Sequence, residues 1–300
     1  MKVKKKGSQG PALDKSEKFV SGLAVVFLTI LMLAAILPVL HVVSKAFSKG
    51  TYVTAGQVYF WPRGFQLETV SYILNKTRFF SALKNTLIVT FFGTLVSLFT
   101  SITTAYPLSK PSFKGRKLVS LLYIFSMVFF GGIIPAYMVV QKLGLLDTYA
   151  GMILPFAIVQ FNMFIVKNYF EGLPESIEES AMIDGAGDIR ILVSIVCPMS
   201  TPVIATVGLL YAINYWNNYF HAMMYTSSTN MQTLQVYLYN LIQGGSGHLE
   251  NMTGGTLTTN ITPEGLTAAA VTLSVIPIVA LYPFVQRFLI KGITIGSVKG

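Results

Sequence analysis

The densest group of acidic side chains in this 300-residue chain lies between residues 171 and 188. The segment holds half of the chain's 12 acidic residues: Glu171, Glu175, Glu178, Glu179, Asp184 and Asp188. Carboxylates of this kind form charge-assisted contacts with a basic partner surface. The alternative, a hairpin that rests on lipid headgroups, fits less well because anionic lipid repels acidic side chains. We therefore predict that this segment docks onto another protein.

Local signals predict that the segment folds as a helix, a tight turn and a second helix. Pro174 suits the first turn of a helix, where its missing N–H costs nothing. Gly185 can adopt a positive φ and turn the chain sharply. Gly187 or Asp188 can then cap the second helix, which we expect to end at Pro198. Apolar residues repeat along this second helix at helical spacing: Ile189, Leu192, Val193 and Val196.

The composition places these helices in a membrane protein. The chain is 53% hydrophobic and 11% charged, with a mean hydropathy of +0.61, whereas soluble domains contain about 25% charged residues. An apolar helix of about 20 residues spans a bilayer. Six segments are candidate spans: Phe19–Val43, Thr86–Leu108, Leu118–Val140, Ala150–Val166, Thr201–Ala222 and Thr267–Ile290. Four prolines are expected to break the spans that contain them: Pro135, Pro155, Pro277 and Pro283.

The placement of basic residues predicts the orientation of these spans. With the N-terminus in the cytoplasm, 15 of the 22 lysines and arginines fall on the cytoplasmic side, as the positive-inside rule requires. Both termini and the acidic segment are then cytoplasmic. The net charge of +10 follows this topology and does not indicate nucleic-acid binding, because the cations cluster at span ends. The first apolar run, of roughly 25 residues, exceeds that of a signal peptide, so we expect an uncleaved span.

No group of residues indicates catalysis. No Asp, Glu, Lys or Arg lies near the middle of a candidate span, which disfavours proton-coupled transport and a membrane-embedded enzyme. The chain has no phosphate-binding loop, so a nucleotide that powers it must be hydrolysed by another chain. Cys197 is the only cysteine, which excludes an intrachain disulfide and a cysteine-based zinc site. We predict no catalytic residue and no metal ligand, although a sodium site made of backbone carbonyls stays open.

One face of the fifth span carries neutral polar groups. Tyr211, Asn214, Tyr215 and Asn218 follow the i, i+3, i+4, i+7 spacing of a helix face. Such groups cannot face lipid without losing their hydrogen bonds. Two interpretations remain: hydrogen bonds between helices, or the lining of a pathway for a polar, ring-shaped solute.

The acidic segment resembles a known motif. Residues 179–186, which read Glu-Ser-Ala-Met-Ile-Asp-Gly-Ala and continue to Pro198, resemble the EAA motif of ABC-importer permeases. Residues 173–178 resemble the lead-in to that motif. Asn85, the Trp216-Asn217 pair and residues 291–300 resemble the carbohydrate-uptake branch of this family, near the oligosaccharide and polysaccharide-fragment permeases. Three positions depart from the pattern: Ser180, Leu192 and Cys197.

The resemblance implies an all-α integral membrane protein with six transmembrane helices and the type I ABC importer permease fold. It divides the chain into a basic cytoplasmic tail (1–18), a first transmembrane helix (19–43), an external loop with a surface helix (44–80), an ABC transmembrane type-1 domain (81–290) containing the docking loop (about 168–198), and a cytoplasmic tail (291–300). The implied location is the bacterial inner membrane, with several spans and both termini cytoplasmic.

The resemblance also implies the partners and the function. The partners are a second permease subunit, a cytoplasmic ABC ATPase dimer, an extracellular or periplasmic solute-binding protein and membrane lipid, with no nucleic acid. The chain itself binds no cofactor and is not an enzyme, since ATP and Mg belong to the partner ATPase. It is expected to form half of the pathway of an ATP-driven sugar or oligosaccharide importer. Two alternatives remain: a secondary transporter or channel with a cytoplasmic regulatory hairpin, and an ABC permease for a non-sugar solute.

The resemblance assigns roles within the docking loop. Glu179 and Asp184 are expected to make charged contacts with the ATPase, and Gly185 to provide the bend, followed by Ala186. Three apolar side chains are expected to fill the groove of the ATPase: Ile177, Ala181 and Met182.

Overall fold

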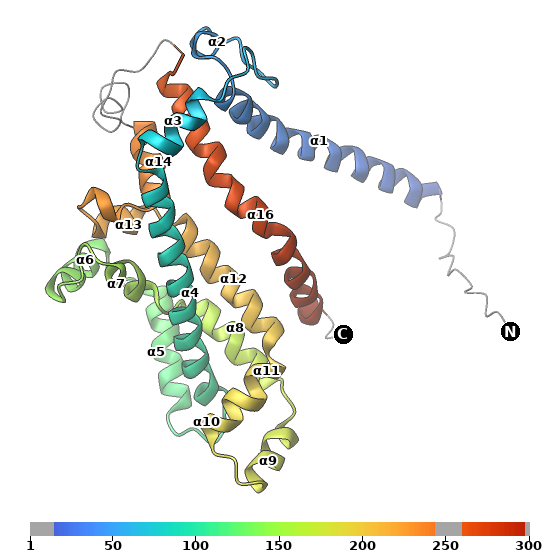
Figure 1. Ribbon diagram of the computed structural model, residues 1–300. Helices are drawn as coiled ribbons and strands as arrows, with labels where there is room; N and C mark the ends of the chain where they lie inside the picture. Colours follow the sequence, from blue (N-terminus) through green and yellow to red (C-terminus); the bar gives the residue numbers. More distant parts are fainter. Residues whose placement is uncertain (1–14, 244–259, 298–300) are drawn as a thin grey trace. The chain divides into compact units, whose positions relative to one another are not determined.

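The structure is a computed structural model that describes residues 15–243 and 260–297, in which the long elements are all helices (Figure 1). The chain divides into two compact units, residues 1–70 with 257–269 and residues 71–256 with 270–300. The helices are α1 (Lys15–Ala46), α2 (Gly50–Thr54), α3 (Glu68–Lys76), α4 (Phe79–Ser109), α5 (Arg116–Val128), α6 (Ile133–Lys142), α7 (Tyr149–Ile153), α8 (Gln160–Glu171), α9 (Glu175–Ile183), α10 (Asp188–Ile191), α11 (Cys197–Met199), α12 (Thr201–Asn217), α13 (Phe220–Tyr225), α14 (Leu234–Gln243) and α16 (Pro263–Ser297).

The first unit consists of α1, the loop that follows it and the start of α16. α1 is apolar along its length, and none of its most apolar window is buried inside the protein, as befits a helix surrounded by lipid. The loop after α1 is fastened by Gln66, whose side-chain amide donates to the backbone oxygens of Ser48 at 3.1 Å and Asn260 at 2.9 Å. Gly50 approaches Asn260 so closely that an added Cβ would lie 2.6 Å from its carbonyl oxygen.

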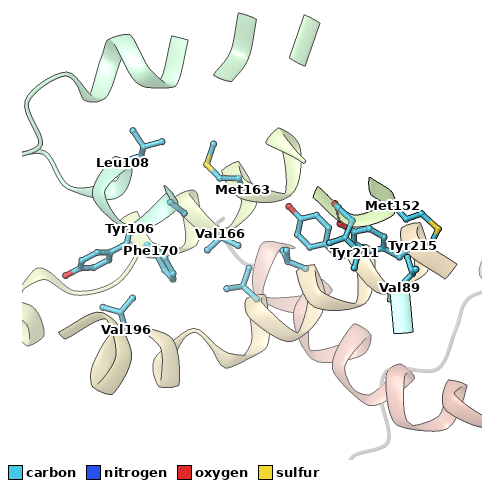
Figure 2. Packing of buried hydrophobic residues seen from close by; sticks show 14 of the residues in the cluster. Val89, Tyr106, Leu108, Met152, Met163, Val166, Phe170, Val196, Tyr211 and Tyr215 are labelled. Carbon is cyan, nitrogen blue, oxygen red and sulfur yellow. Dashed lines mark hydrogen bonds between the residues drawn. The ribbon is translucent and has the colours of Figure 1, made fainter. Parts of the chain in front are cut away.

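The second unit is built around α4, whose most extensive contacts are with α12 and α8. Its buried apolar side chains form one continuous core. Figure 2 shows this core extending from Tyr106, Phe170 and Val196 at one end to Tyr211 and Tyr215 at the other. In Figure 1, α9 and α10 lie beyond one end of α4, and α13 and α14 lie near its other end.

The six predicted spans correspond to three long helices and three bent helix pairs. Among the described residues, three helices are long and apolar enough to cross a bilayer: Lys18–Ala46, Phe79–Ser109 and Pro263–Pro283. The others are α5 with α6, bent by 114°, α7 and the following 3-10 turn with α8, bent by 54°, and α10–α11 with α12, bent by 84°. The predicted spans Leu118–Val140 and Ala150–Val166, which were expected to be broken, each contain two helices.

The breaks have local causes that only partly match the predicted prolines. Between α5 and α6, Gly132 has a φ of 94°, a conformation that side chains rarely adopt. Pro155 lies in the 3-10 turn Leu154–Phe156 between α7 and α8, as expected of a helix breaker. The prediction for Pro277 and Pro283 is wrong, since both lie inside the continuous α16. A proline in a membrane helix removes one hydrogen bond, which neighbouring groups can replace.

Three further boundaries differ from the predictions. The fifth predicted span, Thr201–Ala222, ends earlier, because α12 stops at Asn217 and α13 is a separate helix. α16 continues to Ser297, so most of the predicted tail 291–300 is helical. The predicted surface helix is present as α3, but Ile73 is fully buried, so its apolar face packs on protein. Residues 1–14, the glycine-rich stretch 244–259 and residues 298–300 lie outside the described residues.

Candidate functional site

The acidic hairpin, residues 171–199, forms the predicted helix–turn–helix. α9 begins at Glu175 directly after Pro174 and ends at Ile183. Gly185 has the predicted positive φ, 79°. Its N–H donates to the Met182 oxygen at 3.0 Å, and the Ala186 N–H donates to the Ala181 oxygen at 2.9 Å. These two bonds satisfy the last carbonyl groups of α9 and form a Schellman turn, which requires the left-handed residue at Gly185.

The second arm of the hairpin departs from a plain α-helix. α10 begins at Asp188 after Gly187 in the capping position, and residues 192–196 form a π-helix before α11. The predicted end at Pro198 is wrong, since α11 continues to Met199 and the chain bends at Ser200. The wider π turn places residues five apart on one face. Ile191 and Val196 are consequently buried, at 0% and 1% exposure.

This register turns two predicted apolar positions outward, next to the glycine corner. Ile189 and Val193 are 80% and 61% exposed. Ile183, at the end of α9, is 86% exposed. Ile183 is not among the predicted docking residues, although an isoleucine directly before an Asp-Gly turn is a signal that could have identified it. The corner of the hairpin is therefore an exposed apolar surface.

The predicted docking residues divide between this surface and the core. Met182 and Ile177 are 50% and 37% exposed, and Glu179, Asp184 and Gly185 are also exposed. Ala181 is 8% exposed and packs within the chain's own core, against which Ala186 is also packed. The prediction that Ala181 contacts a partner is thus not supported by its position. Its small side chain instead lets α9 lie close to the rest of the chain.

The acidic residues of the hairpin also divide into two groups. The Glu171 carboxylate pairs with Arg116 on α5 and with Lys167 one turn earlier on α8. The Glu178 carboxylate pairs with Lys110. In the described part of the chain, no ion pair or side-chain hydrogen bond involves the carboxylates of Glu175, Glu179 or Asp184. Glu171 and Glu178 thus fasten the hairpin to the protein, and the two acids predicted to dock, Glu179 and Asp184, remain available to a partner.

A pocket of about 330 Å³ lies at the C-terminal end of α12. Its lining is aromatic and amide, with no formally charged side chain: Phe156, Tyr211, Asn214, Tyr215, Asn217, Asn218, Tyr219, Phe220 and His221. All four residues of the predicted polar face are present in this lining. Aromatic rings that pack on apolar ring faces, next to amides that bond hydroxyl groups, are suited to a sugar.

Within this lining, the tyrosines and the asparagines differ in their surroundings. Tyr211 and Tyr215 are buried, and their hydroxyls lie 2.7 Å from Ser101 Oγ and 3.0 Å from Ser97 Oγ on α4. Asn214 is exposed, whereas the Asn218 side chain accepts from the His221 N–H at 3.3 Å. The tyrosines therefore form hydrogen bonds between helices, and Asn214 is left free to contact a solute.

The opposite end of α4 from the hairpin is held by buried hydrogen bonds. The Asn85 amide donates to the backbone oxygens of Asn230 at 2.8 Å and Gln232 at 2.9 Å, and its oxygen accepts from the Tyr149 hydroxyl at 2.8 Å. Two residues before Tyr149, the Asp147 carboxylate accepts from the backbone N–H groups of Ser227 and Ser228. These bonds hold together the loops that are predicted to be external.

Comparison with known proteins identifies relatives over most of the chain. Residues 87–295 match the family described as binding-protein-dependent transport system inner membrane component. The chain is 41% identical to Protein LplC of Bacillus subtilis (strain 168), over 88% of this chain and 90% of the relative. It is 38% identical to the polygalacturonan/rhamnogalacturonan transport system permease protein YtcP of the same organism, over 91% and 96%. A chain in the crystal structure of a bacterial ABC transporter that imports the acidic polysaccharide alginate matches with a TM-score of 0.85 and 33% identity, over 93% of this chain and 99% of that one.

Proposed function

Because this chain belongs to the family of binding-protein-dependent transport system inner membrane components, we propose that it forms one permease half of an ATP-driven oligosaccharide importer. The family and the structural match confirm the expected all-α importer permease fold in a multi-pass inner-membrane protein. The solute class follows from the relatives, whose names specify polygalacturonan or rhamnogalacturonan and alginate. The aromatic and amide pocket near α12 supports the same class.

The observation that carries the proposed mechanism is the exposed corner of the acidic hairpin. Ile183 and Ile189 are exposed apolar side chains that the chain itself leaves uncovered, in a segment that we place in the cytoplasm. A groove on a second protein would bury them, with Glu179 and Asp184 at the rim. The partner we assign to this surface is a cytoplasmic ATPase, which binds ATP and Mg and supplies the energy that this chain has no motif to harvest.

The remaining partners complete a working cycle. A second permease subunit provides the other half of the pathway, and a solute-binding protein delivers the oligosaccharide to the external loops. ATP binding brings the two ATPases together and moves the hairpins, which opens the pathway outward. Such a switch needs the ATPase to bind the two states of the permease with different free energies. Both termini are cytoplasmic in this arrangement.

The test is to purify the tagged chain from its own host membrane in mild detergent and to measure uptake in cells. We expect an ATPase subunit and a second permease to copurify. Uptake of oligouronides should stop when cellular ATP is depleted and should survive brief dissipation of the proton gradient. Purification of the chain without an ATPase, together with uptake that follows the proton gradient, would refute the proposal.

A further inference from the structure

An ion pair connects the acidic hairpin to the end of α4, and its carboxylate is buried while the Lys110 side chain is 25% exposed. Glu178 on α9 is 7% exposed, and its carboxylate accepts hydrogen bonds from the ammonium group of Lys110, directly after the end of α4. Tyr106, one turn earlier on α4, donates its hydroxyl to the same carboxylate at 3.4 Å. The Lys110 nitrogen also lies 4.8 Å from the centre of the Tyr106 ring. Two groups at the end of α4 thus hold one carboxylate of α9.

Burial distinguishes Glu178 from the other acids of α9. The Glu178 side chain is largely shielded from water, so its ion pair with Lys110 resists separation more than a fully exposed pair does. Glu175 and Glu179 lie on the same helix and are exposed. The ring contact between Tyr106 and Phe170, with centroids 6.3 Å apart, packs the same junction from the side of α8. α9 and the end of α4 are therefore expected to move together.

Helix α4 also reaches the pocket at the end of α12. Ser101 and Ser97 lie on α4 before Tyr106, and their hydroxyls are bonded to Tyr211 and Tyr215 in the pocket lining. A helix rises about 1.5 Å per residue, so Ser97 and Lys110 are separated by roughly 20 Å of continuous α-helix. Both ends of this length are fastened by buried polar bonds. A displacement of one end is thereby carried to the other.

We propose that Glu178 is a positioning residue that transmits movement of the acidic hairpin through Lys110 and α4 to the pocket. The inference rests on the proposed function, because it needs an ATPase that moves the hairpin. When the ATPase displaces α9, the ion pair makes α4 follow, and the serine–tyrosine bonds move the pocket-lining face of α12. Without the pair, the hairpin still binds the ATPase, but its movement is taken up at the junction between α9 and α4.

The test is the number of solute molecules transported per ATP hydrolysed, measured on the purified complex in proteoliposomes with its binding protein. The complex that carries Glu178→Gln should assemble and hydrolyse ATP. The number of solute molecules transported per ATP should fall about tenfold, which is within the usual range of coupling between two sites. A merely structural role would lower the yield of complex and reduce both activities in proportion. Glu175→Gln, which alters an exposed acid on the same helix, is the matched control and should leave the ratio unchanged.

A charge exchange provides the second arm. Lys110→Glu alone should lower the ratio as Glu178→Gln does, and the double exchange Lys110→Glu with Glu178→Lys should restore most of it by rebuilding the pair in reverse. The double exchange also answers the question if Glu178→Gln fails to assemble. A normal ratio in Glu178→Gln, or a double exchange no better than Lys110→Glu alone, overturns the inference. Loss of the ATPase from the wild-type complex would instead refute the proposed function.

Discussion

The hydroxyl of Tyr211 on α12 lies 2.7 Å from the Oγ of Ser101 on α4, and both side chains are almost fully buried. The same hydroxyl accepts from the backbone N–H of Val159 at 3.0 Å. One phenol therefore joins α4, α12 and the segment that leads into α8. Since α4 makes its most extensive contacts with α12 and α8, this joint lies at the centre of the second unit.

Tyr211→Phe should destabilise the protein by about 1–3 kcal/mol, because it leaves the Val159 N–H and the Ser101 hydroxyl buried without a partner. The expected readout is a lower melting temperature of the detergent-purified protein. The double variant Tyr211→Phe with Ser101→Ala removes one of these orphaned groups and should recover part of the loss. A melting temperature equal to that of the wild type would show that the bond contributes no stability.

Asn214→Ala separates the two interpretations of the polar face on α12. Asn214 is exposed in the pocket lining, so its truncation should leave the melting temperature unchanged. If the pocket binds solute, loss of one amide hydrogen bond should reduce uptake by roughly tenfold or less, since such a bond contributes about 0.5–1.5 kcal/mol. Unchanged uptake at limiting solute concentration would remove Asn214 from the pathway.

The sequence predicts this fold best at the turn after α9. Gly185 has the predicted positive φ there, a conformation that residues with a Cβ rarely adopt. Apolar length likewise identified the segments that cross the membrane. The breaks within them were only partly predictable, since Pro155 interrupts its helix as predicted while Pro277 and Pro283 lie inside α16. Tertiary packing, and not proline itself, decides whether neighbouring groups replace the lost hydrogen bond.

The candidate site was predictable by residue type but not by exposure. The 3.6-residue period grouped Ile189 and Val193 with Val196 on one apolar face of the second arm, whereas in the structure Val196 is buried with Ile191 and the other two are exposed. A sequence pattern contains no signal for this one-residue shift. The roles of the acids could not be predicted either. Glu178 and Glu179 are adjacent in the sequence, and only the three-dimensional position of Lys110 shows that Glu178 is the paired and buried one.

Gly185→Ala should uncouple transport without preventing membrane insertion. Gly185 has a φ of 79°, and no atom lies within 4 Å of an added Cβ, so the cost comes from the backbone alone. A side chain in the left-handed region costs roughly 1–2 kcal/mol, which favours a distorted turn and lowers binding to the ATPase. Gly185→Asp should have a larger effect because it also adds a charge at the corner.

Gly172→Ala is the control for Gly185, since Gly172 has an ordinary φ of −86° and an added Cβ would make ordinary contacts with the backbone oxygens of Tyr169 at 3.5 Å and Asn168 at 3.8 Å. Its uptake should match that of the wild type. Equal uptake by Gly185→Ala and Gly172→Ala, at equal membrane content, would contradict the role assigned to the turn.

Ile183→Ser should weaken binding of the ATPase. Ile183 is 86% exposed in the isolated chain, and full burial of such a side chain stabilises a contact by about 1.5–3 kcal/mol. The dissociation constant of the ATPase from the solubilised permease should therefore rise roughly 10- to 100-fold. Ile183→Leu keeps the apolar surface and should bind almost normally. Equal affinities for Ile183→Ser and Ile183→Leu would place the docking surface elsewhere.

Asp147 should make the stability of the external loops depend on pH under acidic conditions. The N–H groups of Ser228 and Ser227 donate to its carboxylate and lower its pKa below the ordinary value of an aspartate. Because the folded pKa is the lower one, the stabilisation is complete above the unfolded pKa and is lost as pH falls through the folded pKa.

Asp147 also has a φ of 58°, which asparagine tolerates well, so Asp147→Asn isolates the charge. Melting temperatures of wild type and variant should differ near neutral pH, begin to converge as pH falls below the ordinary aspartate pKa of about 3.9, and meet below the folded pKa. A constant difference across this range would show that the carboxylate charge does not contribute.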